Sequence, residues 1–359
     1  MKSYNEILSD VTKTATKIPQ SDYLDTGKYR IFDQGKEYSV GFSNDEQGVV
    51  SDYPYIIFGD HTRVVKYVNE PCFIRADGVK LLKVINKDFN PRFVYYNILA
   101  KPIENQGYAR HFKFLKEIQF TEKTLSVQTN IVTELDTIQS AIDNKKQQLS
   151  LLDEAVKSRF IEMFGDILAG KYKFETRKLG EISEVGSSHR VFTTEFVEHG
   201  IPFYRGTEIG ELANGKIPQK PYYISEEHYQ RLIAQDSKPQ IGDLLMPSIC
   251  NKGQVWMVDT EEPFYYKDGR VLSISPNREI YNSKYLQYFM REKTLVEYPK
   301  LGSGSTFAEF KIFLLKDIDI LTPPLSLQND FASFVQQIDK SKFEIANSLK
   351  RLYNKWMLS

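Results

Sequence analysis

Two stretches, FLKEIQFTEKTLSVQ at residues 114–128 and LLKDIDILTPPLSLQ at residues 314–328, decide the fold, because they are two copies of one motif. The alignment continues beyond the motif without a gap. The matched apolar residues are Ile131, Leu135, Ile138, Leu149, Leu152 and Val156 in the first copy, and Phe331, Val335, Ile338, Leu349, Leu352 and Trp356 in the second. A repeat of this size indicates one structural unit used twice. Two related surfaces in tandem favour binding at two places on one partner.

The region after each motif has the pattern of a long helix. Apolar residues of 125–164 recur at steps that alternate between four and three, which is the heptad seam of a coiled coil. Neither Pro nor Gly occurs between Lys123 and Phe164. A helix over residues 125–164 would be about 60 Å long, at roughly 1.5 Å per residue. Residues 325–358 repeat the pattern after a Pro-Pro pair, which is tolerated at a helix start.

Each predicted helix carries one lysine in its seam, Lys145 in the first and Lys342 in the second. The two lysines stand at different phases of the repeat. Polar residues at single seam positions select partner and register. We therefore predict that the two helices pack on each other, antiparallel and within one chain. The predicted seam comprises Ile131, Leu135, Ile138, Leu149, Leu152, Phe331, Val335, Ile338, Leu349 and Leu352.

The remaining segments, 1–120 and 171–322, are predicted to be two globular domains of α+β class that resemble each other. EILSDV (6–11) matches EISEV (181–185), and GKYRIFDQG (27–35) matches GIPFYRGTEIG (200–210). FGDHTRVVKYV (58–68) matches IGDLLMPSICNKGQVWMV (241–258), and ADGVKLLKV (76–84) matches KDGRVLSI (267–274). Short β-branched and aromatic runs separated by turn dipeptides indicate a mainly β core. Residues 91–101 and 282–295 have helical spacing.

Composition limits the class of protein. With 41% hydrophobic and 13% aromatic residues, the 359-residue chain has enough apolar sequence for packed domains. Lys plus Arg equals Asp plus Glu at 47 each, which neither supports nor excludes nucleic-acid binding. The two cysteines, Cys72 and Cys250, form no CxxC pair and are predicted to be buried apolar residues. Without a membrane-length apolar run or a signal peptide, we expect a soluble, cytoplasmic protein.

No catalytic motif is complete. GELANGK (210–216) resembles part of a phosphate-binding loop, but Ile217 stands where Ser or Thr should meet magnesium. NPRF (90–93) and DYPY (52–55) each lack the second proline of the [ND]-P-P-[FY] motif of amino-methyltransferases. The five histidines lack metal-ligand spacing. We therefore predict no catalytic residue and no metal site.

Polar and basic residues gather instead at the turns of both globular halves. Such side chains grip phosphates and read base edges. Any single one of them is better explained as a solvated loop residue, but the repeat predicts that one face of each domain meets the same partner. The candidate DNA-binding residues are His61, Thr62, Arg63, Arg75, Lys80, Ser188, His189, Arg190, Arg205, Lys252, Gln254, Lys267 and Arg270.

Three segments carry a resemblance to a known family. LLDEAVKSRFIEMFGD (151–166) resembles the central conserved region of type I restriction–modification specificity subunits. PPLSLQNDFASFVQQID (323–339) is similar to the second conserved region of that family, and GDHTRVVKYV with ADGVKLL resembles its target-recognition domains. The resemblance implies target-recognition domain 1 at 1–120, a spacer helix at 121–170, target-recognition domain 2 at 171–322, and a second spacer helix at 323–359.

The resemblance also implies a function. Each target-recognition domain would read one half of a split, asymmetric sequence in double-stranded DNA, and the coiled coil would fix the spacing. Two modification subunits would methylate adenine N6 with S-adenosylmethionine, and restriction subunits would hydrolyse ATP with Mg²⁺. Those cofactors belong to the partners, so this chain itself would not be an enzyme and would need no cofactor or membrane.

Two other functions are compatible with parts of the sequence. A self-contained DNA methyltransferase would need a cofactor loop and an intact [ND]-P-P-[FY] motif, neither of which is found in the sequence. A coiled-coil scaffold without a nucleic-acid role would explain the helices, but it leaves two related globular domains with similar loop residues unexplained.

Overall fold

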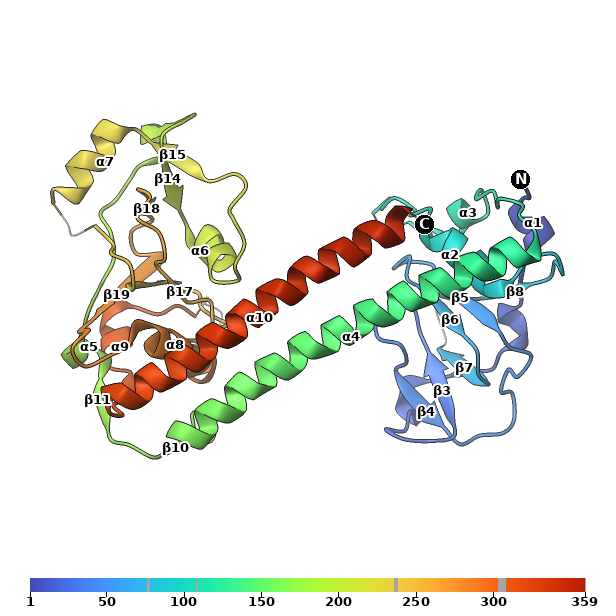
Figure 1. Ribbon diagram of the computed structural model, residues 1–359, viewed down its shortest axis with the longest axis horizontal. Helices are drawn as coiled ribbons and strands as arrows, with labels where there is room; N and C mark the ends of the chain where they lie inside the picture. Colours follow the sequence, from blue (N-terminus) through green and yellow to red (C-terminus); the bar gives the residue numbers. More distant parts are fainter. Residues whose placement is uncertain (76–77, 108, 236–237, 303–307, 359) are drawn as a thin grey trace. The chain divides into compact units, whose positions relative to one another are not determined.

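The computed structural model describes residues 1–75, 78–107, 109–235, 238–302 and 308–358, so Ala76 and Asp77 of the matched segment 76–84 lie outside it. The chain forms two compact units (Figure 1). Unit 1 comprises Met1–Lys146 with Ala346–Ser359, and unit 2 comprises Gln147–Ile345. Each unit therefore contains a piece of both long helices. The mixed α+β class and the two globular parts agree with the expectation from sequence.

The long helices have the predicted bounds, with α4 at Leu125–Phe164 and α10 at Leu325–Leu358. In unit 1 the Lys355 ammonium lies 3.1 Å from the Glu134 carboxylate. In unit 2 the rings of Phe160 and Phe331 are 5.3 Å apart, and the seam lysine Lys342 forms an ion pair with Asp153. Residues near the end of one helix contact residues nearer the start of the other, so the two helices are antiparallel in each unit.

The predicted seam residues lie on the packed faces of these helices. Leu135, Ile138, Phe331 and Val335 are at most 6% exposed. The other six are half-buried, namely Ile131, Leu149, Leu152, Ile338, Leu349 and Leu352. By contrast, Leu151, which is outside the seam, is 53% exposed. Burying one stripe of each helix is how a heptad pattern stabilises a helix pair.

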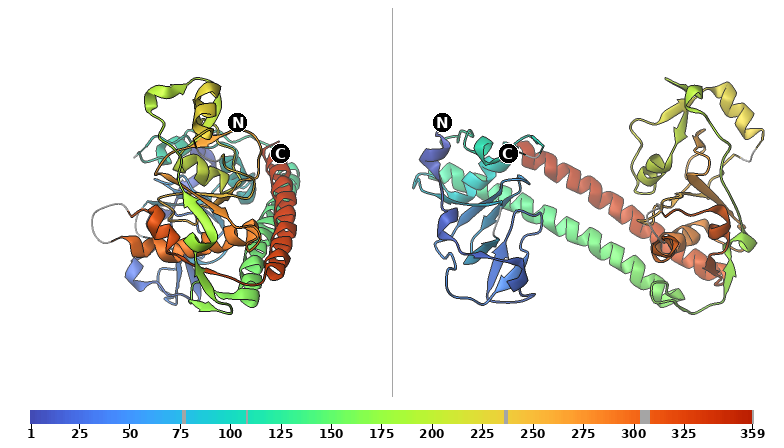
Figure 2. Two further views of the ribbon diagram at one scale, coloured as in Figure 1. Left: turned by 90° about the vertical axis from the view of Figure 1, so that its left-hand side faces the viewer. Right: turned by 180° about the vertical axis from the view of Figure 1, so that it is seen from behind.

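Unit 1 holds two four-stranded sheets, which lie to one side of the first half of α4 (Figures 1 and 2). The first is antiparallel, with the order β1 (Leu8–Asp10), β8 (Val79–Val84), β5 (Tyr55–Gly59), β6 (Val65–Val68). The second has the order β2 (Lys17–Ile18), β7 (Cys72–Arg75), β3 (Tyr29–Phe32), β4 (Gly41–Ser43). All of β5 is buried, as its β-branched and aromatic residues predict. The helices are α1 (Tyr4–Ile7), α2 (Pro91–Leu99) and α3 (Phe112–Leu115).

Unit 2 repeats this plan. Its antiparallel sheet has the order β12 (Ser183–Gly186), β19 (Val271–Pro276), β16 (Leu244–Pro247), β17 (Trp256–Met257). Its second sheet has the order β13 (Phe196–Val197), β15 (Tyr222–Ile224), β14 (Ile201–Tyr204), β18 (Tyr265–Tyr266). Two short pairs join β9 (Gly165–Asp166) to β10 (Lys171–Tyr172) and β11 (Thr176–Lys178) to β20 (Asp319–Leu321). The helices are α5 (Leu179–Ile182), α6 (Gly206–Leu212), α7 (Glu226–Ile233), α8 (Ser283–Glu297) and α9 (Ile312–Lys316).

One predicted correspondence between the two domains is wrong. Gly59-Asp60 ends strand β5, whereas Gly242-Asp243 precedes the equivalent strand β16. The sheet register aligns Gly59 with Pro247, because these residues face Val79 and Val271 on the equivalent neighbouring strands. Asp60 therefore corresponds to Ser248. The shared Gly-Asp letters are a coincidence, since the hydrogen-bonded register decides equivalence.

The repeated glutamine of the LSVQ and LSLQ motifs has the same structural role in each unit. The Gln128 Oε1 atom accepts the Asn90 N–H at 2.7 Å, and Nε2 donates to the carbonyls of Asp88 and Lys123 at 2.7 and 2.8 Å. Gln328 Oε1 accepts the Asn282 N–H at 2.9 Å, and Nε2 donates to two carbonyls at 2.9 Å. Asn90 and Asn282 cap α2 and α8. A fully buried amide thus joins each long helix to the start of a domain helix.

Candidate nucleic-acid interface

In unit 1 the candidate residues lie around one end of the antiparallel sheet. The turn after β5 contains His61, Thr62 and Arg63, and the Asp60 N–H ties it to the Gly78 carbonyl at 2.8 Å. Gln34, which sequence reasoning missed, supports this turn. Its side-chain Oε1 accepts the His61 N–H at 3.2 Å, and its carbonyl accepts the Thr62 hydroxyl at 2.5 Å. The His61 side chain is left exposed to solvent.

Arg63 stabilises the turn, and its charge is not freely exposed. Its φ of 62° is the left-handed conformation that the tight turn requires. Its guanidinium donates to the Ile103 carbonyl at 3.2 Å, and its Nε is buried without a hydrogen-bond partner among the described residues. The arginine stem therefore packs into the unit, and no signal in the sequence indicated this role.

Arg75 and Lys80 are both occupied within unit 1. The Arg75 guanidinium donates to Gln20 Oε1 at 3.0 Å and lies 3.9 Å from the Asp33 carboxylate. The Lys80 ammonium lies 3.4 Å from the Asp10 carboxylate and over the Phe112 ring. A phosphate at this end of the sheet would have to compete with these carboxylates.

In unit 2 the loop after β12 lies on the turn that precedes β19. The Ser188 hydroxyl donates to the Tyr266 carbonyl at 2.5 Å, and the His189 N–H donates to the Tyr265 hydroxyl at 2.9 Å. The Arg190 guanidinium is 3.7 Å from the Asp268 carboxylate and remains 71% exposed. The structure thus brings Ser188, His189 and Arg190 together with Lys267 and Arg270.

A carboxylate missed by sequence reasoning holds Arg270 in this cluster. The Arg270 guanidinium is 2.6 Å from the Glu309 carboxylate, and the Lys311 ammonium pairs with the same group. The hydrogen bond from Lys311, together with the charges of Lys311 and Arg270, holds the pKa of Glu309 below its ordinary value. Glu309 is far from Arg270 in sequence, so no local pattern identifies the pair.

The remaining candidates of unit 2 lie at the N-terminal cap of α6 and on the loop after β16. The Arg205 guanidinium pairs with Glu208 at 2.5 Å and covers the Tyr222 ring. Gln254 Oε1 accepts the Lys252 N–H at 3.0 Å, which shapes the loop. The side chains of Lys252 and Lys267 have no acidic partner among the described residues. These two lysines are therefore the cations most available to an anionic ligand.

The two clusters occupy equivalent ends of the two sheets. The Asp60 N–H donates to the Gly78 carbonyl at 2.8 Å, and its carbonyl accepts the His111 N–H at 2.8 Å. The Ser248 N–H donates to the Arg270 carbonyl at 2.9 Å, and its carbonyl accepts the Phe310 N–H at 2.8 Å. Each unit thus closes this sheet end with the same backbone bonds and presents different side chains from it.

The described residues offer neither a metal site nor a membrane span. Within them, no three His, Cys, Asp or Glu side chains are grouped closely enough to hold a metal ion. Over the same ranges, no helix has the length and apolar character needed to cross a membrane.

Comparison with known proteins identifies the family. Residues 171–352, just over half of the chain, match the family model of the type I restriction modification DNA specificity domain. The chain is 26% identical over 243 residues to the specificity subunit of the Escherichia coli type I restriction enzyme EcoR124I/EcoR124II. That alignment covers 61% of this chain and spans 58% of the length of the curated relative.

A solved structure agrees on the fold. The type I restriction-modification system S subunit from M. genitalium matches with a TM-score of 0.60 at 13% sequence identity. The match covers 99% of this chain and 94% of the other. With the family model, the relative and the repeated fold together, the chain belongs to the family of type I restriction modification DNA specificity domains.

Proposed function

We propose that this chain is the subunit that reads DNA sequence in a type I restriction–modification complex, each globular domain reading one half of a bipartite, asymmetric target. The observation that carries the proposal is the pair of equivalent sheet ends, which share backbone bonds but differ in their exposed side chains. Two domains that share a fold but expose different side chains are expected to recognise two different DNA half-sites. Family membership adds independent support.

The proposed division of labour follows the family. Two modification subunits would methylate adenine N6 using S-adenosylmethionine, restriction subunits would use ATP and Mg²⁺, and this chain would direct both to the target without catalysis of its own. The helices α4 and α10 would set the spacing between half-sites, which on one face of B-DNA repeat about every 34 Å. The domain boundaries proposed are 1–120, 121–170, 171–322 and 323–359, and the proposed compartment is the cytoplasm.

The thirteen candidate residues remain the proposed DNA contacts, although Arg75 ends strand β7 and Lys80 lies in strand β8 and not in a turn. Their partners within each unit distinguish them. Arg63, Arg75, Lys80, Arg205 and Arg270 already have partners within their own unit. Phosphate contacts from free lysines give sequence-independent affinity, whereas base contacts give specificity. We therefore propose Lys252 and Lys267 of unit 2 as phosphate contacts. For base readout we propose the exposed His61 in unit 1, and Ser188, His189, Arg190 and Gln254 in unit 2, although these four also bond within their own unit.

Replacing both Lys252 and Lys267 by Ala is expected to weaken DNA binding of the assembled complex equally for target and non-target sequences. Loss of two phosphate contacts should reduce the slope of log affinity against log salt by about 2. Affinity would be measured by fluorescence anisotropy at several salt concentrations. The matched control is Lys157→Ala with Lys340→Ala, two exposed lysines on the helices of the same unit. An unchanged salt slope in the first variant would remove both residues from the interface.

The proposed function is tested by mapping methylated adenines across a genome, in cells that contain the modification subunit with or without this chain. We expect a two-part methylated motif that is present only with the chain, with a constant spacer between its halves. Absence of any motif with an active modification subunit would contradict the proposal. A motif with a single part would contradict the assignment of one half-site to each domain.

A further inference from the structure

The arginines of the first domain differ in whether their charge is used within unit 1. Residues 1–120 contain five arginines, and four of them have an acceptor in this unit. Those four are Arg30, Arg63, Arg75 and Arg92, with acceptors on Glu70, Ile103, Gln20 and Asp136 respectively. The fifth, Arg110, is exposed, and the described residues offer its guanidinium neither a hydrogen bond nor an ion pair. Its N–H donors are therefore available to a ligand.

Arg110 stands near the end of a loop that is attached to the turn after β5. At the start of the loop, the Ile103 carbonyl accepts a hydrogen bond from the Arg63 guanidinium at 3.2 Å. At its end, the His111 N–H donates to the Asp60 carbonyl at 2.8 Å. The loop is therefore held at both ends by the turn that carries the candidate residues of unit 1, and Arg63 acts as one of the two attachments.

The His111 side chain strengthens the second attachment, directly beside Arg110. The ring is fully buried, its Nδ1 lies 3.1 Å from the Asp60 carbonyl, and its Nε2 accepts the Gln106 N–H at 3.2 Å. These two bonds fit the neutral ring with its proton on Nδ1. The Phe112 N–H also donates to the Asp60 carboxylate at 2.8 Å. The backbone next to Arg110 is thus fixed, as accurate placement of a side chain on a base requires.

The corresponding position of unit 2 holds a carboxylate. His111 closes the sheet end of unit 1 and Phe310 closes that of unit 2 through the same backbone bond, and both side chains are at most 1% exposed. The preceding residue is Arg110 in unit 1 and Glu309 in unit 2. One residue more separates Phe310 from α9 than His111 from α3, so the bond and the burial decide this equivalence. The two domains therefore present opposite charges at one shared position.

The strand beside this position differs as well. The carbonyls of Gly78 and Arg270 accept equivalent backbone bonds in the two units. In unit 2 the Arg270 guanidinium pairs with Glu309 at 2.6 Å, so the two charges neutralise each other. In unit 1 the glycine has no side chain to offer. The replacement of an Arg–Glu pair by a Gly–Arg pair leaves the charge of Arg110 open to a ligand.

We propose that Arg110 reads a guanine in the half-site of unit 1, its guanidinium donating to O6 and N7 of the base in the major groove. Guanine presents two acceptors side by side at that edge, and the guanidinium presents two parallel donors. Glu309 cannot make this contact in unit 2, because an ionised carboxylate only accepts hydrogen bonds. The proposal rests on the proposed function and adds to it one residue and the base which that residue selects.

The first test compares methylated adenines in cells that contain the original chain or the Arg110→Ala chain. The half-site of unit 1 is identified as the one that changes when residues 1–120 are exchanged. We expect one guanine position of that half-site to lose its base preference, and the other half-site to stay unchanged. Because Arg110 is exposed and has no partner among the described residues, the variant should fold normally, which circular dichroism would verify.

The second test isolates the hydrogen bond to N7. The chain is assembled with its modification subunits and bound to a duplex that carries the mapped motif, with guanine or 7-deazaguanine at the position in question. Removal of N7 should weaken binding of the original complex about fivefold or more, and should leave binding of the Arg110→Ala complex unchanged. This double substitution, one in the protein and one in the base, measures the contact between the two groups.

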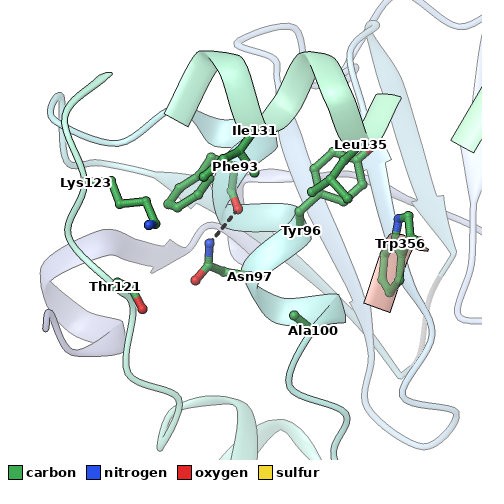
Figure 3. A pocket seen from close by; sticks show the side chains of 9 residues that line it. All are labelled: Phe93, Tyr96, Asn97, Ala100, Thr121, Lys123, Ile131, Leu135 and Trp356. Atoms are coloured by element: carbon green, nitrogen blue, oxygen red, sulfur yellow. Dashed lines mark hydrogen bonds between the residues drawn. The ribbon is translucent and has the colours of Figure 1, made fainter. Parts of the chain in front are cut away.

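Lys123→Ala is the matched control. Lys123 is an exposed cation of the same unit without an acidic partner among the described residues, and it lines a cavity beside α2 and α4 (Figure 3). Its replacement should change neither the methylated motif nor the effect of 7-deazaguanine. A control variant that relaxed the same guanine position as Arg110→Ala would overturn the proposal, since the effect would then not belong to Arg110.

Three further results would overturn the assignment of Arg110. One is a methylation map unchanged by Arg110→Ala, and another is a half-site of unit 1 without a G·C pair. The third is an equal loss of affinity for target and non-target DNA, with a salt slope smaller by about 1, which would place Arg110 on a phosphate. In all three the original chain still gives a bipartite motif. Absence of that motif with the original chain would contradict the proposed function itself, and this proposal with it.

Discussion

Replacement of residues 171–322 by the corresponding segment of a relative is expected to change one half of the methylated DNA motif and to leave the other half unchanged. The segment contains both four-stranded sheets of unit 2 and every proposed contact of that unit. Its two ends lie side by side, because β11 pairs with β20 from Thr176↔Leu321 to Lys178↔Asp319. An exchange at these ends therefore leaves α4 and α10 intact.

The expected effect of that exchange is large. Each mismatched base pair costs about 1–3 kcal/mol, roughly additively, so a new half-site of three or more bases abolishes recognition of the old one. Methylated adenines would be mapped in cells with the original and the exchanged chain. The reciprocal exchange of residues 1–120 is the control and should alter the other half-site. Changes in both halves after one exchange would show that the domains do not read independently.

Gln328→Ala is expected to destabilise unit 2 by about 3 kcal/mol or more. The substitution removes a buried amide and leaves three backbone groups, the Asn282 N–H and the carbonyls of Ile280 and Pro323, without their partner. Each unsatisfied buried group costs about 1–3 kcal/mol. Gln128→Ala should have a similar effect on unit 1, since its amide makes the equivalent three bonds.

Urea unfolding followed by circular dichroism would measure these effects, with the two units giving separate transitions. Gln328→Ala should move one transition and Gln128→Ala the other. Gln336→Ala, at an exposed position of α10, is the matched control and should change the free energy of unfolding by less than about 0.5 kcal/mol. A Gln328→Ala protein as stable as this control would show that the amide does not join the helix to its domain.

The helices could be read directly from the sequence because periodicity is a local property. The bounds 125–164 and 325–358 follow from the heptad steps and from the absence of Pro and Gly, and the structure has the same bounds. The equivalence of the domains was also visible, since Ile7 and Ile182 end equivalent helices before equivalent strands. The Gly-Asp alignment failed because identical letters stood on opposite ends of equivalent strands.

The environment of the candidate contacts could not be predicted in this way. The ion pairs of Arg270 with Glu309 and of Arg75 with Asp33 each join residues about 40 positions apart in the sequence, with whole strands or helices between them. The φ of 62° at Arg63 and the bond of its side chain to the Ile103 carbonyl depend on the folded backbone and not on the local sequence. Residue type therefore identified where cations gather, but not which of them are neutralised by carboxylates of their own unit.

The division of unit 1 into two stretches of chain, Met1–Lys146 and Ala346–Ser359, affects how the protein is made. A ribosome adding about 5–20 residues per second needs roughly 10–40 s to synthesise the intervening residues. During that interval the first part of α4 has no α10 to cover its apolar stripe, and Leu135 and Ile138 stay open to solvent or to chaperones. Unit 2 is continuous in sequence and can finish first. A chain without residues 346–359 would therefore be impaired in the folding of unit 1, although most of that unit is synthesised before unit 2.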